Sequence, residues 1–131
     1  MTNPSIRVLV VDDQAPFRMA ARFVLKRADG FEQVGEAESG EESVDKVAEL
    51  TPDLVLMDIN MPGINGIEAT RQIIAAAPST VVFLCSTYQL GDLPADAATS
   101  GAKAYVNKEE IGPDLLARLW AERDHEGLAS A

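Results

Sequence analysis

The sequence contains few of the residues that build cross-links, zinc sites or membrane spans. Its 131 residues include one cysteine, Cys85, and one histidine, His125. A lone cysteine cannot form a disulfide within the chain, and a lone histidine without further ligands makes no zinc site. No apolar run approaches the roughly 20 residues that span a bilayer. We therefore expect a cytoplasmic chain with no place in a membrane.

Positive charge is scarce as well. The chain has 11 lysines and arginines against 21 aspartates and glutamates, which gives a formal net charge of -10. Such a charge repels phosphate backbones and anionic lipids, so we expect no direct binding to nucleic acid. The length and the hydrophobic content of 47% fit one domain over residues 1–131. We place its core at about residues 6–123 and a flexible tail at 124–131.

Five short apolar runs predict strands, and the continuous ones are typical of strands buried on both faces of a parallel sheet. The runs cover residues 6–11, 31–37, 54–57, 81–85 and 104–106. Helical periodicity follows each run. This alternation predicts an α/β fold with right-handed crossovers and a doubly wound, five-stranded parallel sheet. Periodicity does not fix the strand order, but five such units commonly adopt the flavodoxin-like order 2-1-3-4-5.

Helix starts are marked by prolines or by capping side chains. These residues are Pro16, Ser39, Asn65 and Pro113. Between residues 88 and 101 the helical pattern is disrupted, because Gly91 and Pro94 both oppose helix formation. We expect a short helix there, beginning near Pro94.

Polar side chains stand at the ends of the predicted strands. They are Asp12 and Asp13 after the first strand, Asp58 after the third, Ser86 after the fourth and Lys108 after the fifth. In a parallel sheet these ends open on one edge, so the side chains should converge. Three carboxylates so close together repel each other unless a cation neutralises them. Mg²⁺ (or Mn²⁺) suits a site of two or three carboxylates with a position left open for phosphate.

Such a set of side chains fits phosphoryl transfer. Lys108 and the metal would cancel charge on the phosphoryl oxygens, and the Ser86 hydroxyl would donate to one of them. Asp58 would be the nucleophile and would form an aspartyl phosphate. Each residue alone also has a plain structural explanation, since an Asp-Asp pair at a strand end is often only a helix cap. The combination favours the chemical interpretation.

Four motifs, in this order, resemble the receiver domain of bacterial two-component response regulators. They are Val10-Val11-Asp12-Asp13, Asp58-Ile59-Asn60-Met61-Pro62-Gly63, Ser86-Thr87 and Tyr105-Val106-Asn107-Lys108. The resemblance runs from about residue 7 to residue 121. It implies that Asp58 takes a phosphoryl group from a phosphohistidine on a sensor histidine kinase or a histidine phosphotransfer protein.

The resemblance also implies roles for single residues. Asp13 would bind Mg²⁺ directly, Asp12 would act mainly through water, and Asn60 would contribute its backbone carbonyl. Lys108 matches the family's lysine. Ser86 and Tyr105 match its hydroxyl position and its switching aromatic residue.

The switch expected from this resemblance begins at Ser86. Ser86 would move to bond the phosphoryl group, and Tyr105 would turn into the space that it leaves. The surface of the fourth helix, fifth strand and last helix would then change. Asn60 and Tyr88 each lie two residues beyond a key position and border the path of an attacking water. Bulky Tyr88 would lengthen the lifetime of the phosphoryl group by shielding it.

Two departures from the family pattern stand out. Many receivers have proline after the lysine, whereas Glu109 follows Lys108 here, as in receivers that resemble those of LuxR-like regulators. We therefore expect a trans peptide bond after Lys108. The second departure is the disrupted helix with Gly91 and Pro94, which belongs to the face that such proteins usually present to partners.

Several functions remain open at this stage. The first is a signalling switch, not an enzyme, with slow autodephosphorylation, an unknown downstream protein and room for a phosphorylation-dependent homodimer. A receiver fragment of a longer transcriptional regulator would look the same. An aspartate-nucleophile phosphatase is disfavoured, because those enzymes resemble each other in a second acid two residues after the nucleophile, where this chain has Asn60. A phosphorylation-independent docking module is weakened because no expected pocket residue is missing.

Overall fold

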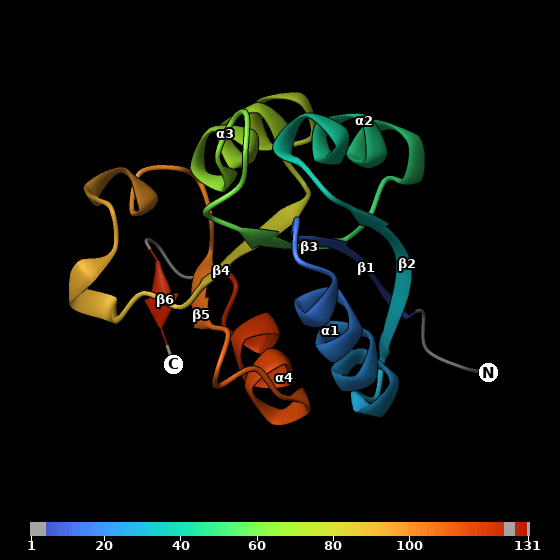
Figure 1. Cartoon of the computed structure of the whole chain (residues 1–131). Helices are drawn as coiled ribbons and strands as arrows, with labels where there is room; N and C mark the ends of the chain where they lie inside the picture. The colour runs from blue at the N-terminus through green and yellow to red at the C-terminus, as the bar shows by residue number, and fades with distance from the viewer. Residues whose placement is uncertain (1–4, 125–127, 131) are drawn as a thin grey trace.

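The computed structural model describes residues 5–124 and 128–130, and is built around a parallel sheet with helices on both faces (Figure 1). The strands are β1 (Ile6–Val11), β2 (Phe31–Ala37), β3 (Leu54–Asp58), β4 (Val81–Ser86), β5 (Ala104–Asn107) and β6 (Ala129–Ser130). Their order is β2-β1-β3-β4-β5-β6, and every neighbouring pair is parallel. The predicted order 2-1-3-4-5 is confirmed for the first five strands.

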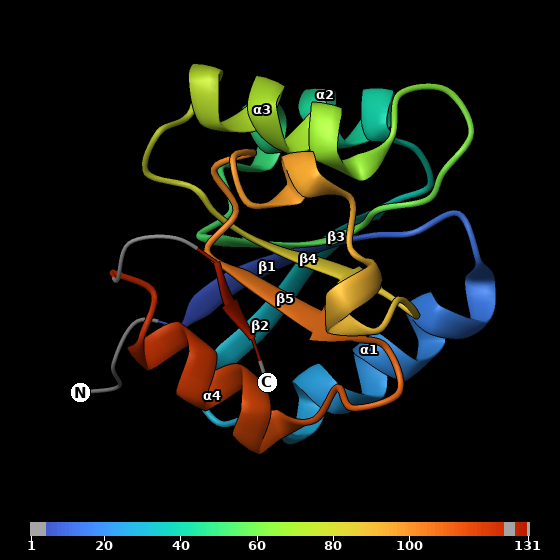
Figure 2. The ribbon, with the colours of Figure 1, turned by 90° about the vertical axis from the view of Figure 1, so that its left-hand side faces the viewer.

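The helices form two layers. They are α1 (Ala15–Arg27), α2 (Gly40–Leu50), α3 (Gly66–Ala76) and α4 (Pro113–Ala121). Helices α2 and α3 cover one face of the sheet, and α1 and α4 cover the other (Figure 2). Alternate strand residues supply the two cores: Leu9 and Val55 face the first layer, while Val8 and Leu54 face the second. All four side chains are fully buried, as expected for strands covered on both faces.

Two helices begin at the capping residues that the sequence predicts. Ser39 Oγ accepts a hydrogen bond from the Glu42 N–H at 3.0 Å, and Asn65 Oδ1 accepts one from the Glu68 N–H at 3.0 Å. The Glu42 carboxylate also accepts from the Glu38 N–H at 2.7 Å. Each cap satisfies an N–H that the helix itself leaves unpaired, worth about 1 kcal/mol.

The predicted fourth helix does not form. The segment between β4 and β5 contains two short 3-10 turns, η1 (Leu90–Asp92) and η2 (Ala95–Ala97). The prediction placed a helix near Pro94, and the structure has a single turn there, with Pro94 just before it. Gly91 raises the entropic cost of helix, and Pro94 restricts the residue before it to extended conformations. No α-helix propagates between these two residues.

A sixth strand lies where the sequence predicts a flexible tail. β6 pairs with β5, with Ala129 opposite Ala104. Leu128 is half-buried against the core on the α2 and α3 side. Two strand residues are too few to show a periodicity, so no sequence pattern predicts this strand. Residues 125–127 and 131, including His125, lie outside the described part of the chain.

The thiol of Cys85 provides a test of the packing around β4. Cys85 is fully buried, and burial raises the pKa of its thiol to about 12. Because the thiolate is the reactive form, we expect no reaction with a chromogenic disulfide reagent at pH 8 in the folded protein. Reaction should become complete after unfolding in guanidinium chloride. Rapid reaction of the folded protein would contradict this packing.

Candidate functional site

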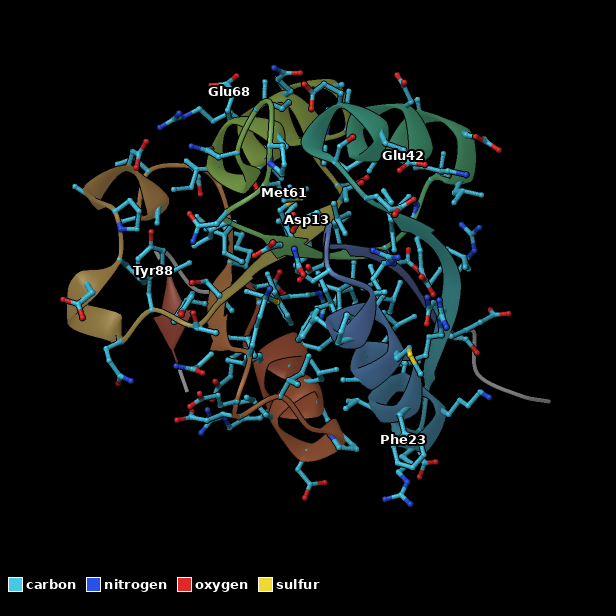
Figure 3. The ribbon with its side chains drawn as sticks, in the orientation of Figure 1. Asp13, Phe23, Glu42, Met61, Glu68 and Tyr88 are labelled. Atoms are coloured by element: carbon cyan, nitrogen blue, oxygen red, sulfur yellow. The ribbon has the colours of Figure 1, made fainter. Side chains whose placement is uncertain are left out.

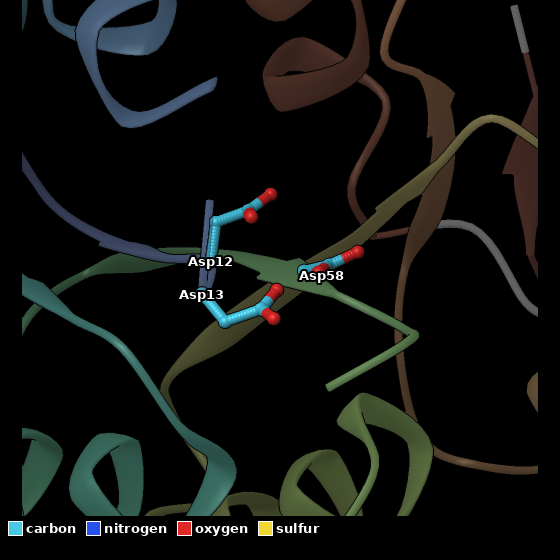
Figure 4. A group of neighbouring side chains, drawn as sticks. All are labelled: Asp12, Asp13 and Asp58. Carbon is cyan, nitrogen blue, oxygen red and sulfur yellow. The ribbon is translucent and has the colours of Figure 1, made fainter. Parts of the chain in front are cut away.

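The carboxyl ends of β1, β3 and β5 bring an acidic cluster and one lysine together. Carboxylate oxygens of Asp12, Asp13 and Asp58 lie within 4.8 Å of one another. Lys108 Nζ lies 2.5 Å from Asp12 Oδ2 and 3.1 Å from Asp58 Oδ1. Figure 4 shows Asp12 and Asp13 leaving adjacent positions in diverging directions, with Asp58 beside them. The expected convergence of strand-end residues is therefore found for Asp12, Asp13, Asp58 and Lys108.

Burial makes this cluster electrostatically demanding. Asp12 is fully buried and Asp58 is 3% exposed. Burial raises the pKa of Asp58 to about 6, and the charges of Asp12 and Asp13 add to that effect against the opposing pull of Lys108. Burial alone would lower the pKa of Lys108, but its close contact with Asp12 and the charges of Asp58 and Asp12 outweigh burial and raise it. When all four groups are ionised, the site keeps two uncompensated negative charges.

One oxygen of the cluster lacks a directed hydrogen bond. Among the described residues, no donor satisfies Asp12 Oδ2 with good geometry, although Lys108 Nζ lies close enough for a strong charge contact. A buried carboxylate oxygen without a hydrogen bond, next to two further carboxylates, is a suitable ligand for a hard divalent cation. The donor set of Asp12, Asp13 and Asp58 therefore fits such an ion, which would also offset the excess negative charge.

Arg18 of α1 holds the first acid in place. Its Nη1 donates to the Asp12 carbonyl at 2.8 Å, and it forms ion pairs with Glu36 at 3.3 Å and Glu38 at 3.5 Å. The Gln14 N–H donates to Asp12 Oδ1 at 2.8 Å. No sequence pattern assigned Arg18 to the site, although its position in the first turn of the helix that follows Asp12 was an available signal. Arg18 thus connects the acidic loop to α1 and to the end of β2.

Phe17 is a second residue that the sequence analysis did not assign to the site. Lys108 Nζ lies 4.8 Å from the centre of the Phe17 ring, a cation–π contact. Phe17 also packs against the core on the α1 and α4 side. The ammonium group is therefore confined by two carboxylates and an aromatic face.

The loop after β3 approaches the site so closely that one position requires glycine. A Cβ at Gly66 would overlap the carbonyl oxygen of Asp58. The Gly66 N–H donates to the Ile59 carbonyl at 2.9 Å, and the Ile59 N–H donates to the Cys85 carbonyl at 3.1 Å. This packing fixes the backbone on which Asp58 stands.

Tyr88 connects the segment after β4 to the loop after β3. Its hydroxyl donates to Asn60 Oδ1 at 3.4 Å, and its N–H donates to Ser86 Oγ at 2.9 Å. Figure 3 shows Tyr88 beside the segment that follows β4, toward the edge of the molecule, and Asp13 near its centre. The segment after β4 therefore contacts the Asp58 loop through Tyr88 and Asn60. These are the two residues that the sequence predicts to affect the lifetime of the phosphoryl group.

Tyr105 already points inward in the structure. It is 3% exposed, and its hydroxyl contacts the carbonyl oxygens of Tyr88 at 2.6 Å and Ser86 at 3.0 Å. The sequence interpretation has Tyr105 turning inward after Ser86 moves. Here the inward ring occurs together with a Ser86 hydroxyl that accepts a hydrogen bond from the Tyr88 N–H, and the switch on phosphorylation stays a prediction. The structure also has no cis peptide bond among its described residues, in agreement with the trans bond expected after Lys108.

The comparisons with known proteins agree on one family. Residues 8–120 match the family described as response regulator receiver domain. Response regulator GacA of Pseudomonas viridiflava is 44% identical over 103 residues, which cover 79% of this chain and 48% of GacA. Chemotaxis protein CheY of Thermotoga maritima is 41% identical over 102 residues, which cover 78% of this chain and 84% of CheY. The chain thus spans about half the length of GacA.

Solved structures give the same result. A LuxR-family two-component response regulator from Aurantimonas sp. SI85-9A1 superposes with a TM-score of 0.82 at 30% identity, covering 95% of this chain and 89% of that one. The response regulator domain of Thermotoga maritima CheB superposes with a TM-score of 0.81 at 33% identity, covering 93% and 98%. No helix within residues 5–124 and 128–130 has the length and apolar character of a membrane span. This chain belongs to the response regulator receiver domain family.

Proposed function

We propose that this receiver is activated when Asp58 accepts a phosphoryl group from a phosphohistidine of a sensor histidine kinase or a histidine phosphotransfer protein. The observation that carries the proposal is the Lys108 ammonium, held between Asp12 and Asp58 beside a trio of carboxylates. An Asp58 oxygen forms the new bond to phosphorus while the bond from phosphorus to the donor imidazole breaks. The imidazole nitrogen keeps the electron pair.

Each group at the site has a part in this transfer. Lys108 stabilises negative charge on the phosphoryl oxygens, and Ser86 donates its hydroxyl hydrogen to one of them. Mg²⁺, or Mn²⁺ in its place, would be held by Asp12, Asp13, Asp58 and the backbone carbonyl of Asn60, and would supply further charge neutralisation. Arg18 contributes indirectly, because it fixes the backbone of Asp12.

A persistent phosphoryl group fits this site better than rapid turnover. An aspartate-nucleophile phosphatase needs a general acid/base two residues after its nucleophile, and Asn60 cannot exchange a proton at neutral pH. In the structure, the side-chain oxygen of Asn60 instead accepts a hydrogen bond from the Tyr88 hydroxyl. These residues support slow autodephosphorylation and a signalling switch.

The output of the switch lies on the face made by residues 87–103, β5 and α4. Phosphorylation gives the Ser86 hydroxyl a new acceptor for its hydrogen. In the structure, the oxygen of this hydroxyl accepts a hydrogen bond from the Tyr88 N–H. A shift of Ser86 therefore reaches the segment after β4 directly, and the inward Tyr105 is bonded to the same segment. A downstream protein or a second copy of this chain would read the changed face.

A receiver within a longer transcriptional regulator is the second candidate, because the match to GacA covers 48% of that protein. In either case we assign residues 1–131 to the receiver, whose packed part extends past residue 123 to Leu128 and β6. Both candidates share the phosphorylation chemistry at Asp58, so they differ in the output and not in the site.

The proposed chemistry predicts a covalent product. Incubation with a small phosphodonor and Mg²⁺ should add the mass of one phosphoryl group to the intact wild-type protein. Asp58→Asn should show no such gain, and neither should wild type with a metal chelator. A gain of mass in Asp58→Asn would place the phosphoryl group elsewhere and contradict the proposal.

The acidic cluster predicts stabilisation by Mg²⁺. An ion bound only to the folded state at about ten times its Kd adds about 1.4 kcal/mol to the free energy of unfolding. We therefore expect Mg²⁺ to raise the melting temperature by a few degrees. Asp13→Asn should reduce this shift strongly, whereas Asp45→Asn, an exposed carboxylate on α2, should keep it. Equal shifts in the two variants would contradict the assignment, and differential scanning fluorimetry measures them.

The position of Tyr88 predicts its effect on phosphoryl lifetime. Tyr88→Ala should lose the phosphoryl group several-fold faster than wild type, because water reaches Asp58 more easily. Tyr88→Phe keeps the ring but loses the bond to Asn60, and should lie between the two. Decay of the phosphorylated mass, followed after removal of the donor, measures these rates. Decay of Tyr88→Ala at the wild-type rate would exclude shielding.

A further inference from the structure

The segment from β4 to β5 needs an anchor beside the site, because its only helical elements are η1 and η2. That anchor is the carbonyl oxygen of Tyr88. It accepts one hydrogen bond from the Tyr105 hydroxyl at 2.6 Å and another from Asn107 Nδ2 at 3.2 Å. Both donors belong to β5. The start of the segment is therefore held by side chains from the neighbouring strand.

Asn107 makes a second contact with the other end of its amide. Its Oδ1 accepts from the Glu109 N–H at 2.9 Å, and its main-chain carbonyl accepts from the Glu110 N–H at 2.9 Å. These bonds form the turn that follows Lys108. One amide group thus connects the Tyr88 carbonyl to the backbone that carries the lysine.

Only an amide of this length provides both contacts. Aspartate at neutral pH keeps the acceptor but has no hydrogen to donate, and leucine of similar size has neither. The strand ends are also joined at adjacent positions, since the Lys108 N–H donates to the Ser86 carbonyl at 2.8 Å. Asn107 therefore completes a clamp around the residues on which the site depends.

We propose that Asn107 is a positioning residue for the phosphoryl site, which holds Tyr88 beside Asn60 in the loop after Asp58 and fixes the turn after Lys108 at the same time. This inference rests on the proposed function, since it is the phosphoryl group on Asp58 that Tyr88 shields. Asn107 acts through Tyr88 and touches none of the reacting atoms. Its removal leaves the Tyr105 bond to the same carbonyl in place, so the fold is retained while the position of Tyr88 loosens.

A double-mutant cycle tests this role. Asn107→Leu should speed the loss of the phosphoryl group several-fold in the wild-type background and have little further effect in Tyr88→Ala. Asn107→Ser serves as the second variant if leucine impairs folding. Thr99→Ala is the matched control, because it removes a side-chain hydrogen bond to Asp96 in the same segment but away from the site, and its rate should equal that of wild type. A wild-type rate in Asn107→Leu, or the same acceleration with and without Tyr88, overturns the proposal.

A measurement without phosphorylation separates this inference from the proposed function. In the metal-free protein, Asn107→Leu should increase the rate of amide hydrogen exchange at Tyr88 and Glu109, measured by NMR, and Thr99→Ala should not. Unchanged exchange at both amides refutes the clamp even if Asp58 is phosphorylated normally. Failure of wild type to gain a phosphoryl group refutes the proposed function, while faster exchange in Asn107→Leu still supports the clamp.

Discussion

The contact of the Lys108 ammonium with two buried carboxylates is the interaction on which the site depends. Asp12 and Asp58 come from neighbouring strands and would repel each other strongly without a positive charge between them. Burying charged groups is costly, and the single positive charge of Lys108 leaves two of the three carboxylate charges of the cluster uncompensated. The arrangement therefore gains from a divalent cation and from a bound phosphoryl group whose charge Lys108 can share. The same electrostatic imbalance that costs stability prepares the site for its chemistry.

The sheet makes this imbalance possible because it fixes the strand ends rigidly. β1 and β3 are neighbours at the point where the strand order reverses, which is where open α/β sheets bind their ligands. Apolar residues on both faces of these strands hold them in register under two helical layers. Arg18 and Gly66 then set the backbone on either side, one through the Asp12 carbonyl and the other through close contact with Asp58.

The segment between β4 and β5 is held by side chains of the neighbouring strand instead of by an α-helix. The helical sequence pattern is disrupted at Gly91 and Pro94. The start of the segment is fixed by hydrogen bonds from the side chains of Tyr105 and Asn107 to the Tyr88 carbonyl. This part of the molecule is consequently built from turns, β5 and α4. Because Tyr88 belongs to this segment and also contacts Asn60 in the loop after Asp58, the same few bonds hold the segment and its contact with the site.

The sequence by itself determined the parallel α/β fold, most of the helix starts and the group of Asp12, Asp13, Asp58 and Lys108, because apolar runs, caps and strand-end acids are local patterns. Local patterns also indicated that Gly91 and Pro94 disrupt the helix after β4, but they predicted a short helix near Pro94 where the structure has two 3-10 turns. Only the tertiary structure decided the inward position of Tyr105, the roles of Arg18 and Phe17 at the site, and the pairing of β6 with β5. Those features arise from contacts between segments far apart in the chain, and a side chain's spacing along its own helix or strand does not specify which distant carbonyl, carboxylate or strand edge it will meet.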